Sequence, residues 1–136
     1  MRSFVLVALF LASCGGGDMT EPPASDSRGV VLSLDLESPH PGDTLTLTVE
    51  NNTRGRLEYG LVYRLEHFVE GDWRWINRDA GFALILKIVD AGKREREDIE
   101  LPADLEPGRY RIVKSFTAPE TGRKLDASVQ FNVAGL

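Results

Sequence analysis

The side chains most often used in catalysis and metal binding are scarce in this chain. It has one cysteine and two histidines, His40 and His67, and no spacing pairs the histidines with each other or with a further ligand. Zinc sites and cysteine–histidine nucleophiles need such residues in close sets. The motif Gly-x-Ser-x-Gly, which exposes a nucleophilic serine, is missing from the sequence. The sequence therefore predicts no metal, no cofactor and no catalytic residue, in a protein that is not an enzyme.

Residues 93–101 form a charged segment in which Glu95, Glu97, Asp98 and Glu100 are interspersed with Arg94 and Arg96, and it holds the densest group of carboxylates in the chain. Paired carboxylates act as acid and base when a cleft brings them together. Alternating charges along one extended segment are more typical of a solvated strand that resists edge-to-edge pairing. We interpret the segment as such a strand, with a hydrolase whose site the sequence does not reveal as a remaining alternative.

Aromatic residues offer the best candidate for binding. Trp73 and Trp75 are two residues apart, so on a strand they share a face, and Tyr59 and Tyr63 share a face on the preceding segment. Together with Phe68 they form a candidate binding surface, because exposed tryptophan and tyrosine recognise sugars, peptides and proteins. The alternative is packing in the interior. We expect interior packing for Trp73 and Tyr63, and both alternatives stay open for Trp75.

The N-terminus has the pattern of an export signal. Arg2 precedes an unbroken apolar run over residues 4–12. A membrane-spanning helix needs about 20 apolar residues, whereas the central region of a signal peptide has about 7–15. The run therefore predicts a signal peptide.

The run ends in Leu11-Ala12-Ser13-Cys14, which resembles the lipobox of bacterial lipoproteins. The resemblance implies cleavage between Ser13 and Cys14 and acylation (palmitate) of Cys14, which would anchor the chain to a membrane. Gly15 follows in place of the aspartate that tends to retain such proteins at the inner membrane. The implied location is extracytoplasmic in the cell envelope, on the periplasmic face of the outer membrane in a Gram-negative cell. The alternatives are an ordinary secretory signal and a cytosolic apolar N-terminus.

Composition separates a tether from a folded domain. Residues 14–28 contain mainly Gly, Pro, Ser and acidic side chains, which cannot bury enough apolar surface to fold. We expect a signal peptide at 1–13, a lipidated cysteine and flexible tether at 14–28, and one domain at 29–136. The net charge of −5 argues against nucleic acid as a partner, since binding phosphate backbones requires a basic surface.

From about Gly29 onward, apolar and polar side chains alternate in short segments separated by Gly- and Pro-containing turns. A period of two is typical of half-buried strands, and turn signals every 8–15 residues are typical of a sandwich. The sequence therefore predicts an all-β fold, an immunoglobulin-like antiparallel β-sandwich of seven to eight strands. The expected strands are 31–37, 44–50, 57–67, 73–76, 82–89, 93–101, 110–116 and 125–133.

Tyr110 follows a Pro-Gly turn at the start of the penultimate strand. In immunoglobulin-like folds a tyrosine at this place turns inward and bonds backbone a few residues upstream. We therefore expect Tyr110 to form a structural corner.

The order of these motifs is similar to that of the bacterial immunoglobulin-like domains of secreted and lipid-anchored proteins, and a related pattern occurs in a bacterial proteinase-inhibitor family. The segments that carry the resemblance are His40-Pro41-Gly42-Asp43, Asn51-Asn52, Tyr59-Gly60, Tyr63-Arg64-Leu65-Glu66, Gly71-Asp72-Trp73 and residues 105–114.

We expect from this a non-enzymatic module that binds or scaffolds an envelope protein or glycan. The alternative is an inhibitor that presents the loop at 67–72 or at 118–124 to a protease. The oligomeric state is left open.

Overall fold

Strands, turns and irregular connections make up residues 25–27 and 29–135, the part of the chain that the computed structural model describes. No helix long and apolar enough to cross a bilayer occurs among these residues. They form ten strands: β1 (Ser25–Ser27), β2 (Val30–Leu34), β3 (Thr44–Asn51), β4 (Leu57–Gly60), β5 (Arg64–Val69), β6 (Asp72–Trp75), β7 (Leu86–Val89), β8 (Arg94–Glu100), β9 (Gly108–Ala118) and β10 (Arg123–Val133).

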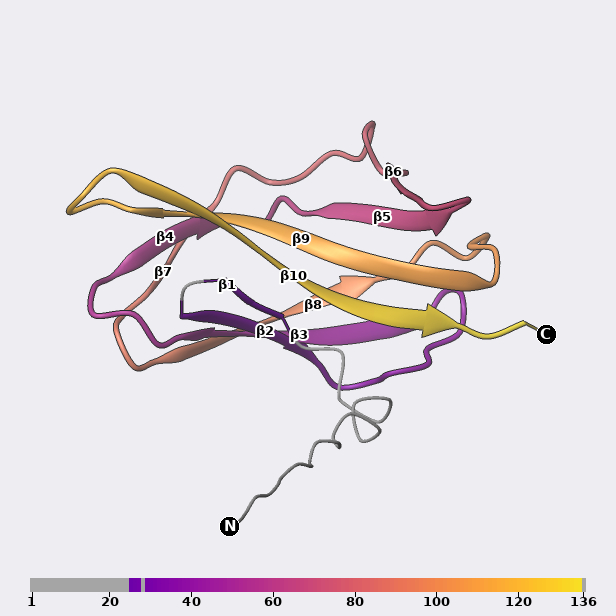
Figure 1. Ribbon diagram of the computed structural model, residues 1–136, viewed down its shortest axis with the longest axis horizontal. Helices are drawn as coiled ribbons and strands as arrows, with labels where there is room; N and C mark the ends of the chain where they lie inside the picture. Colours follow the sequence, from indigo (N-terminus) through magenta and orange to yellow (C-terminus); the bar gives the residue numbers. More distant parts are fainter. Residues whose placement is uncertain (1–24, 28, 136) are drawn as a thin grey trace, which may run out of the picture.

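The strands form two antiparallel sheets that face each other. One sheet has the order β1-β2-β3-β8, and the other has the order β6-β5-β9-β4-β7 with β10 on the free side of β9. Figure 1 shows the two layers, with β9 and β10 running the length of one and β2 and β3 in the other. The predicted immunoglobulin-like β-sandwich is confirmed as the fold class.

Alternation builds the core, as expected. Strand β3 buries Leu45, Leu47 and Val49 and turns its threonines outward. Strand β10 buries every second side chain from Leu125 to Val133. Because successive side chains on a strand point to opposite faces, each sheet presents one apolar face, and the two faces close over a single interior.

Two features raise the strand number above the predicted seven to eight. The segment 57–67 is divided into β4 and β5, because the chain leaves the sheet over residues 61–63. In addition, β1 pairs with β2, with Ser27 opposite Val30, so the sheet begins inside the segment expected to be tether. The folded domain thus starts a few residues before the expected boundary at residue 29.

Two strand ends also differ from the expected ones. Strand β2 stops at Leu34, because the carboxylate of Asp35 accepts the backbone N–H of Thr46 at 2.8 Å and replaces a ladder bond. Leu36 is consequently exposed instead of buried. Residues 82–85, expected to be strand, form an irregular segment that precedes β7.

Candidate binding surface

The five aromatic residues of the predicted surface do not lie together. Tyr59 is only 4% exposed and packs in the core against Phe116, with ring centroids 5.1 Å apart. Tyr63 is half-buried against Phe82, also at 5.1 Å. The two tyrosines therefore do not belong to the surface that carries the tryptophans.

The register of β5 and β6 explains this separation. Trp73 lies opposite Phe68 and Trp75 lies opposite Glu66, so both tryptophans point away from the core. Tyr63 precedes β5 and has the phase of the buried Leu65, opposite to that of Glu66 and Phe68, so alternation does not place it beside the tryptophans.

On this outer face the protein's own arginines cover the aromatic rings. The guanidinium carbon of Arg111 lies 4.3 Å from the ring centroid of Trp73, and Arg109 lies 5.1 Å from that of Phe68. Arg78 covers Trp75 at 4.7 Å. Such contacts between guanidinium groups and aromatic faces are attractive. Each of these rings is therefore already in contact with an arginine of the same domain, although Trp75 stays 38% exposed.

Apolar exposure is concentrated on another part of the molecule. Val62, Leu84, Ile85, Leu86 and Ile88 are all exposed, and we refer to these five residues as the apolar flank. Leu84 is fully exposed and Leu86 is 64% exposed. Contiguous apolar exposure of this kind marks interaction sites, because it leaves a large favourable free energy of burial unused.

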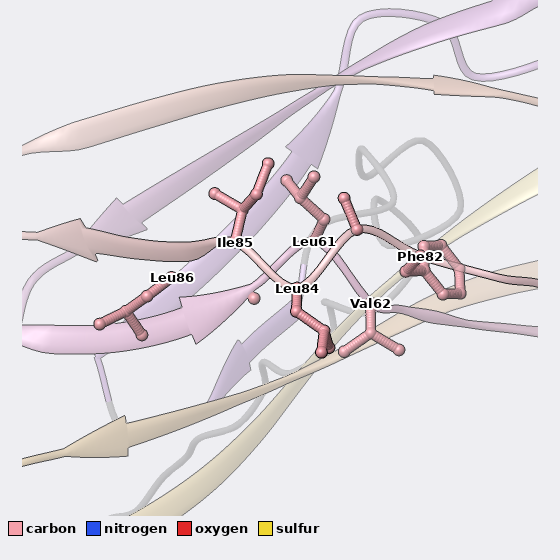
Figure 2. A pocket seen from close by; sticks show the side chains of 8 residues that line it. Leu61, Val62, Phe82, Leu84, Ile85 and Leu86 are labelled. Carbon is pink, nitrogen blue, oxygen red and sulfur yellow. The ribbon is translucent and has the colours of Figure 1, made fainter.

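A groove of about 310 Å³ runs through the apolar flank. Figure 2 shows that its walls come from two segments side by side, with Leu61 and Val62 on one and Leu84 and Ile85 on the other. The residues that line it are Gly60, Leu61, Val62, Phe82, Ala83, Leu84, Ile85 and Leu86.

Side chains distant in sequence hold the first wall in place. The Lys114 ammonium donates to the carbonyl oxygen of Gly60 at 2.9 Å. The Asn77 amide donates to the carbonyl of Tyr63 at 3.1 Å, and its oxygen accepts the N–H of Leu65 at 2.8 Å. These bonds satisfy backbone groups next to the point where the chain has left the sheet, and they hold the irregular segment 61–63 in place.

The second wall is the segment that leads into β7. The N–H of Ile85 donates to the carbonyl of Ala83 at 3.0 Å, which tightens the chain just before the strand. Gly60 then pairs with Leu86, and this pairing joins the two walls at one end of the groove. Strand β7 is the last strand of its sheet, so its outward side chains Leu86 and Ile88 stay uncovered.

An ion pair lies in the interior beneath the first wall. Lys114 belongs to the inward phase of β9, and its ammonium lies 2.7 Å from a carboxylate oxygen of Glu97 on β8. Burial lowers the pKa of Lys114, and the neighbouring Glu97 opposes this shift. Burial also raises the pKa of Tyr59, and the negative charge of Glu97 adds to the rise.

The sequence analysis missed this pair, although its signal was present. Lys114 keeps the same alternation as Tyr110, Ile112 and Phe116, which are all buried. Glu97 likewise keeps the alternation of Ile99, although residues 93–101 were expected to be a solvated strand. Residues of opposite charge at inward positions of two facing strands indicate a buried ion pair, because a buried charge needs a partner.

Tyr110 lies where a corner tyrosine is expected. Its hydroxyl donates to the carbonyl oxygen of Glu106 at 2.6 Å, and its ring is stacked between His67 at 4.2 Å and Phe131 at 5.7 Å. Gly108 makes room for this stack, because a Cβ there would approach the Nε2 of His67 to 2.8 Å.

The two segments considered as inhibitory loops are tight hairpins. Residues 67–69 and 72 belong to β5 and β6, and only Glu70 and Gly71 connect these strands, both with positive φ. The other segment turns within four residues, closed by the N–H of Gly122 on the carbonyl of Ala118 at 2.8 Å. Both segments are therefore short connections between paired strands.

The two histidines have different surroundings. His40 is exposed beside Asp43, and His67 is stacked on Tyr110. Within residues 29–135, no set of three or more potential metal-ligating side chains comes together. Ser13 and Cys14, the expected cleavage and lipidation positions, lie outside the described residues.

Comparison with known families decides the relationship of this chain. The family model described as bacterial Ig-like domain matches residues 26–132. The chain belongs to the bacterial Ig-like domain family. The match covers the sandwich from β1 almost to the end of β10, and this family membership indicates a binding or scaffolding module. No curated protein matches the chain.

Proposed function

We propose that this bacterial Ig-like domain is a lipid-anchored, non-enzymatic binding module of the cell envelope. In this proposal it receives an extended apolar segment of another envelope protein in the groove of the apolar flank. The observation that carries the proposal is the groove itself, an open apolar channel on the surface of a domain whose other hydrophobic side chains are mostly packed inside.

The free energy of burial supports the choice of this surface. Covering one leucine or isoleucine side chain contributes about 1.5–3 kcal/mol. A partner that covers three members of the apolar flank therefore gains enough to offset a substantial part of the cost of association. Lys114 and Asn77 hold the first wall in place before binding, so little further ordering of that wall is needed.

The chemistry of the lining favours a protein over a glycan. Sugar rings are recognised by free aromatic faces combined with polar groups. Here the aromatic faces of Trp73 and Trp75 are covered by Arg111 and Arg78, and the groove is lined mainly by aliphatic side chains. Apolar side chains of a partner protein fit that lining better.

The membrane anchor rests on the lipobox-like sequence that ends in Cys14 and on the apolar run before it. Two or more acyl chains bind a bilayer firmly, whereas a single chain gives only marginal binding. Metabolic labelling of the full chain with palmitate tests the anchor. We expect label on the parent protein and none on Cys14→Ala, since Cys14 is the one cysteine of the chain. Equal labelling of both proteins would contradict the anchor.

Photo-crosslinking in intact cells tests the binding surface. A photo-reactive amino acid is placed at Leu84 in the apolar flank and, as a matched control, at Gln130, an exposed polar position on β10. We expect a discrete adduct of higher mass at Leu84 and none at Gln130. An adduct of twice the mass of the chain would identify a second copy as the occupant and would overturn the proposal of a different envelope protein. Absence of any adduct at Leu84 would overturn it as well.

A further inference from the structure

A second groove, of about 340 Å³, lies at the end of the sandwich where the β3–β4 connection meets the β9–β10 hairpin. Figure 1 shows both connections at the same end of the molecule. Its lining includes three arginines, Arg54, Arg56 and Arg123, the hydroxyl-bearing Thr53 and Thr121, and the carboxylate-bearing Glu120.

Among the described residues, these three arginines have neither the ion pair nor the aromatic contact that most of the other arginines have. Arg64 and Arg111 pair with Glu66, and Arg74 pairs with Glu70. Within residues 29–135, no carboxylate lies within ion-pair distance of Arg54, Arg56 or Arg123, and no aromatic ring lies beneath their guanidinium groups. Guanidinium groups stay charged at every physiological pH.

Glu120 does not neutralise this cluster. One of its carboxylate oxygens lies against Gly55, 3.2 Å from the point that a Cβ would occupy there. With three positive side chains and one negative one, the lining keeps a formal charge of +2, whereas the whole chain carries −5. The groove is therefore a positive site on an acidic protein.

The backbone that carries Arg54 and Arg56 is fixed. The side-chain oxygen of the buried Asn51 accepts the backbone N–H of Thr53 at 2.9 Å and the Thr53 hydroxyl at 2.6 Å. The side-chain nitrogen of Asn51 donates to the carbonyl of Gly55 at 2.9 Å. The same amide donates to the carbonyl of Val89 at 2.9 Å, which ties the connection to β7. Fixing these positions lowers the ordering cost of binding a ligand between them.

We propose that this groove binds a phosphate group. Guanidinium groups bind phosphate oxygens through pairs of parallel N–H···O bonds, and the hydroxyl of Thr121 supplies a neutral donor beside them, whereas the Thr53 hydroxyl already donates to Asn51. The phosphate comes either from a soluble phosphate compound or from an anionic lipid headgroup. This inference does not depend on the apolar flank or on the anchor.

Titration of residues 15–136 with inorganic phosphate, followed by amide resonances in NMR, tests the site. This segment contains every described residue, so all the contacts given above are retained. We expect shifts confined to residues 53–56 and 118–123, and at least a tenfold loss of affinity in the triple variant Arg54→Ala/Arg56→Ala/Arg123→Ala. Shifts spread over the whole surface would overturn the proposal.

A second triple variant controls for charge alone. Arg74→Ala/Arg94→Ala/Arg96→Ala removes the same charge from exposed positions outside the groove. We expect its phosphate affinity to match that of the parent, and an equal loss in both variants would overturn the proposal. If the first variant does not fold, Arg54→Lys/Arg56→Lys/Arg123→Lys keeps the charge but removes the paired bonds, and unchanged affinity there would count against the site.

Vesicles distinguish the two sources of phosphate. Residues 15–136 are sedimented with vesicles of phosphatidylglycerol and, separately, of phosphatidylcholine. Binding to phosphatidylglycerol that the first triple variant loses assigns the site to a lipid headgroup. Phosphate binding in solution without vesicle binding assigns it to a soluble phosphate compound. Failure of both assays removes the proposed site and leaves the proposed function untouched.

Discussion

Replacing Lys114 by methionine tests the physical basis of the groove wall most sharply. The lysine side chain is fully buried, and its ammonium is shared between the Glu97 carboxylate at 2.7 Å and the Gly60 carbonyl at 2.9 Å. Methionine fills similar volume without charge. The variant therefore leaves a carboxylate that is only 9% exposed without its counter-ion, and a carbonyl without its donor.

The expected cost follows from these two losses. Removing one partner of a buried ion pair costs about 3–5 kcal/mol, because the remaining charge stays desolvated. Replacing both partners, in Glu97→Met/Lys114→Met, removes that charge and leaves the orphaned Gly60 carbonyl as the main loss, about 1–3 kcal/mol. The double variant should thus be more stable than the Lys114→Met single variant.

Urea unfolding of residues 15–136, followed by tryptophan fluorescence, measures these free energies. The exposed pair of Arg94 with Glu50, at 3.7 Å, supplies the control, and Arg94→Met should cost less than about 1 kcal/mol. A Lys114→Met variant within about 1 kcal/mol of the parent would refute the reasoning, because a desolvated carboxylate cannot be that inexpensive. A double variant less stable than the single variant would refute it too.

The remaining predictions concern the corner tyrosine, the titration of the three tyrosines, and Asn77. Tyr110→Phe should lower the free energy of unfolding by about 1–2 kcal/mol, since it leaves the Glu106 carbonyl unpaired, and an unchanged urea midpoint would contradict this. Burial raises the pKa of all three tyrosines, so absorbance at 295 nm should show little tyrosinate at pH 10 while the fold persists; half-ionisation there with an intact circular dichroism spectrum would contradict it. The lowered pKa of Lys114 favours folding as pH rises toward 10.5, and the raised pKa values of the tyrosines act in the opposite direction, because the unfolded chain ionises its tyrosines first. Well above pH 10.5 only the tyrosine contribution remains, so stability should fall with rising pH in that range. Asn77→Ala should cost about 1–3 kcal/mol and increase hydrogen exchange at Leu65, whose N–H it leaves without an acceptor, whereas exchange rates equal to those of the parent would count against it.

Alternation made the regular strands predictable. Strands β3 and β10 have strict alternation with one buried face, and a shift of one residue would expose every apolar side chain, so their positions follow from sequence. The division of 57–67 does not follow, because it depends on Lys114 and Asn77, which lie far along the chain. Local pattern carries no information about such contacts.

The candidate binding surface was predictable only in part. Trp73 and Trp75 do share the outward face of β6, as their spacing indicates. Their coverage by Arg111 and Arg78 depends on the strand β9 alongside and on the β6–β7 connection, which spacing does not describe. The apolar flank was missed because an apolar run at 82–89 reads equally well as a buried strand, and only the sheet order shows that β7 lies at an edge.

A crosslinking scan along β7 tests the central claim, that the apolar flank receives a partner. Leu86 and Ile88 point outward, whereas Lys87 between them points toward Glu95 at 3.9 Å. With a photo-reactive amino acid at each of the three positions in intact cells, the account predicts the same adduct at Leu86 and Ile88 and none at Lys87. Equal adducts at all three positions, or none at any of them, would contradict it.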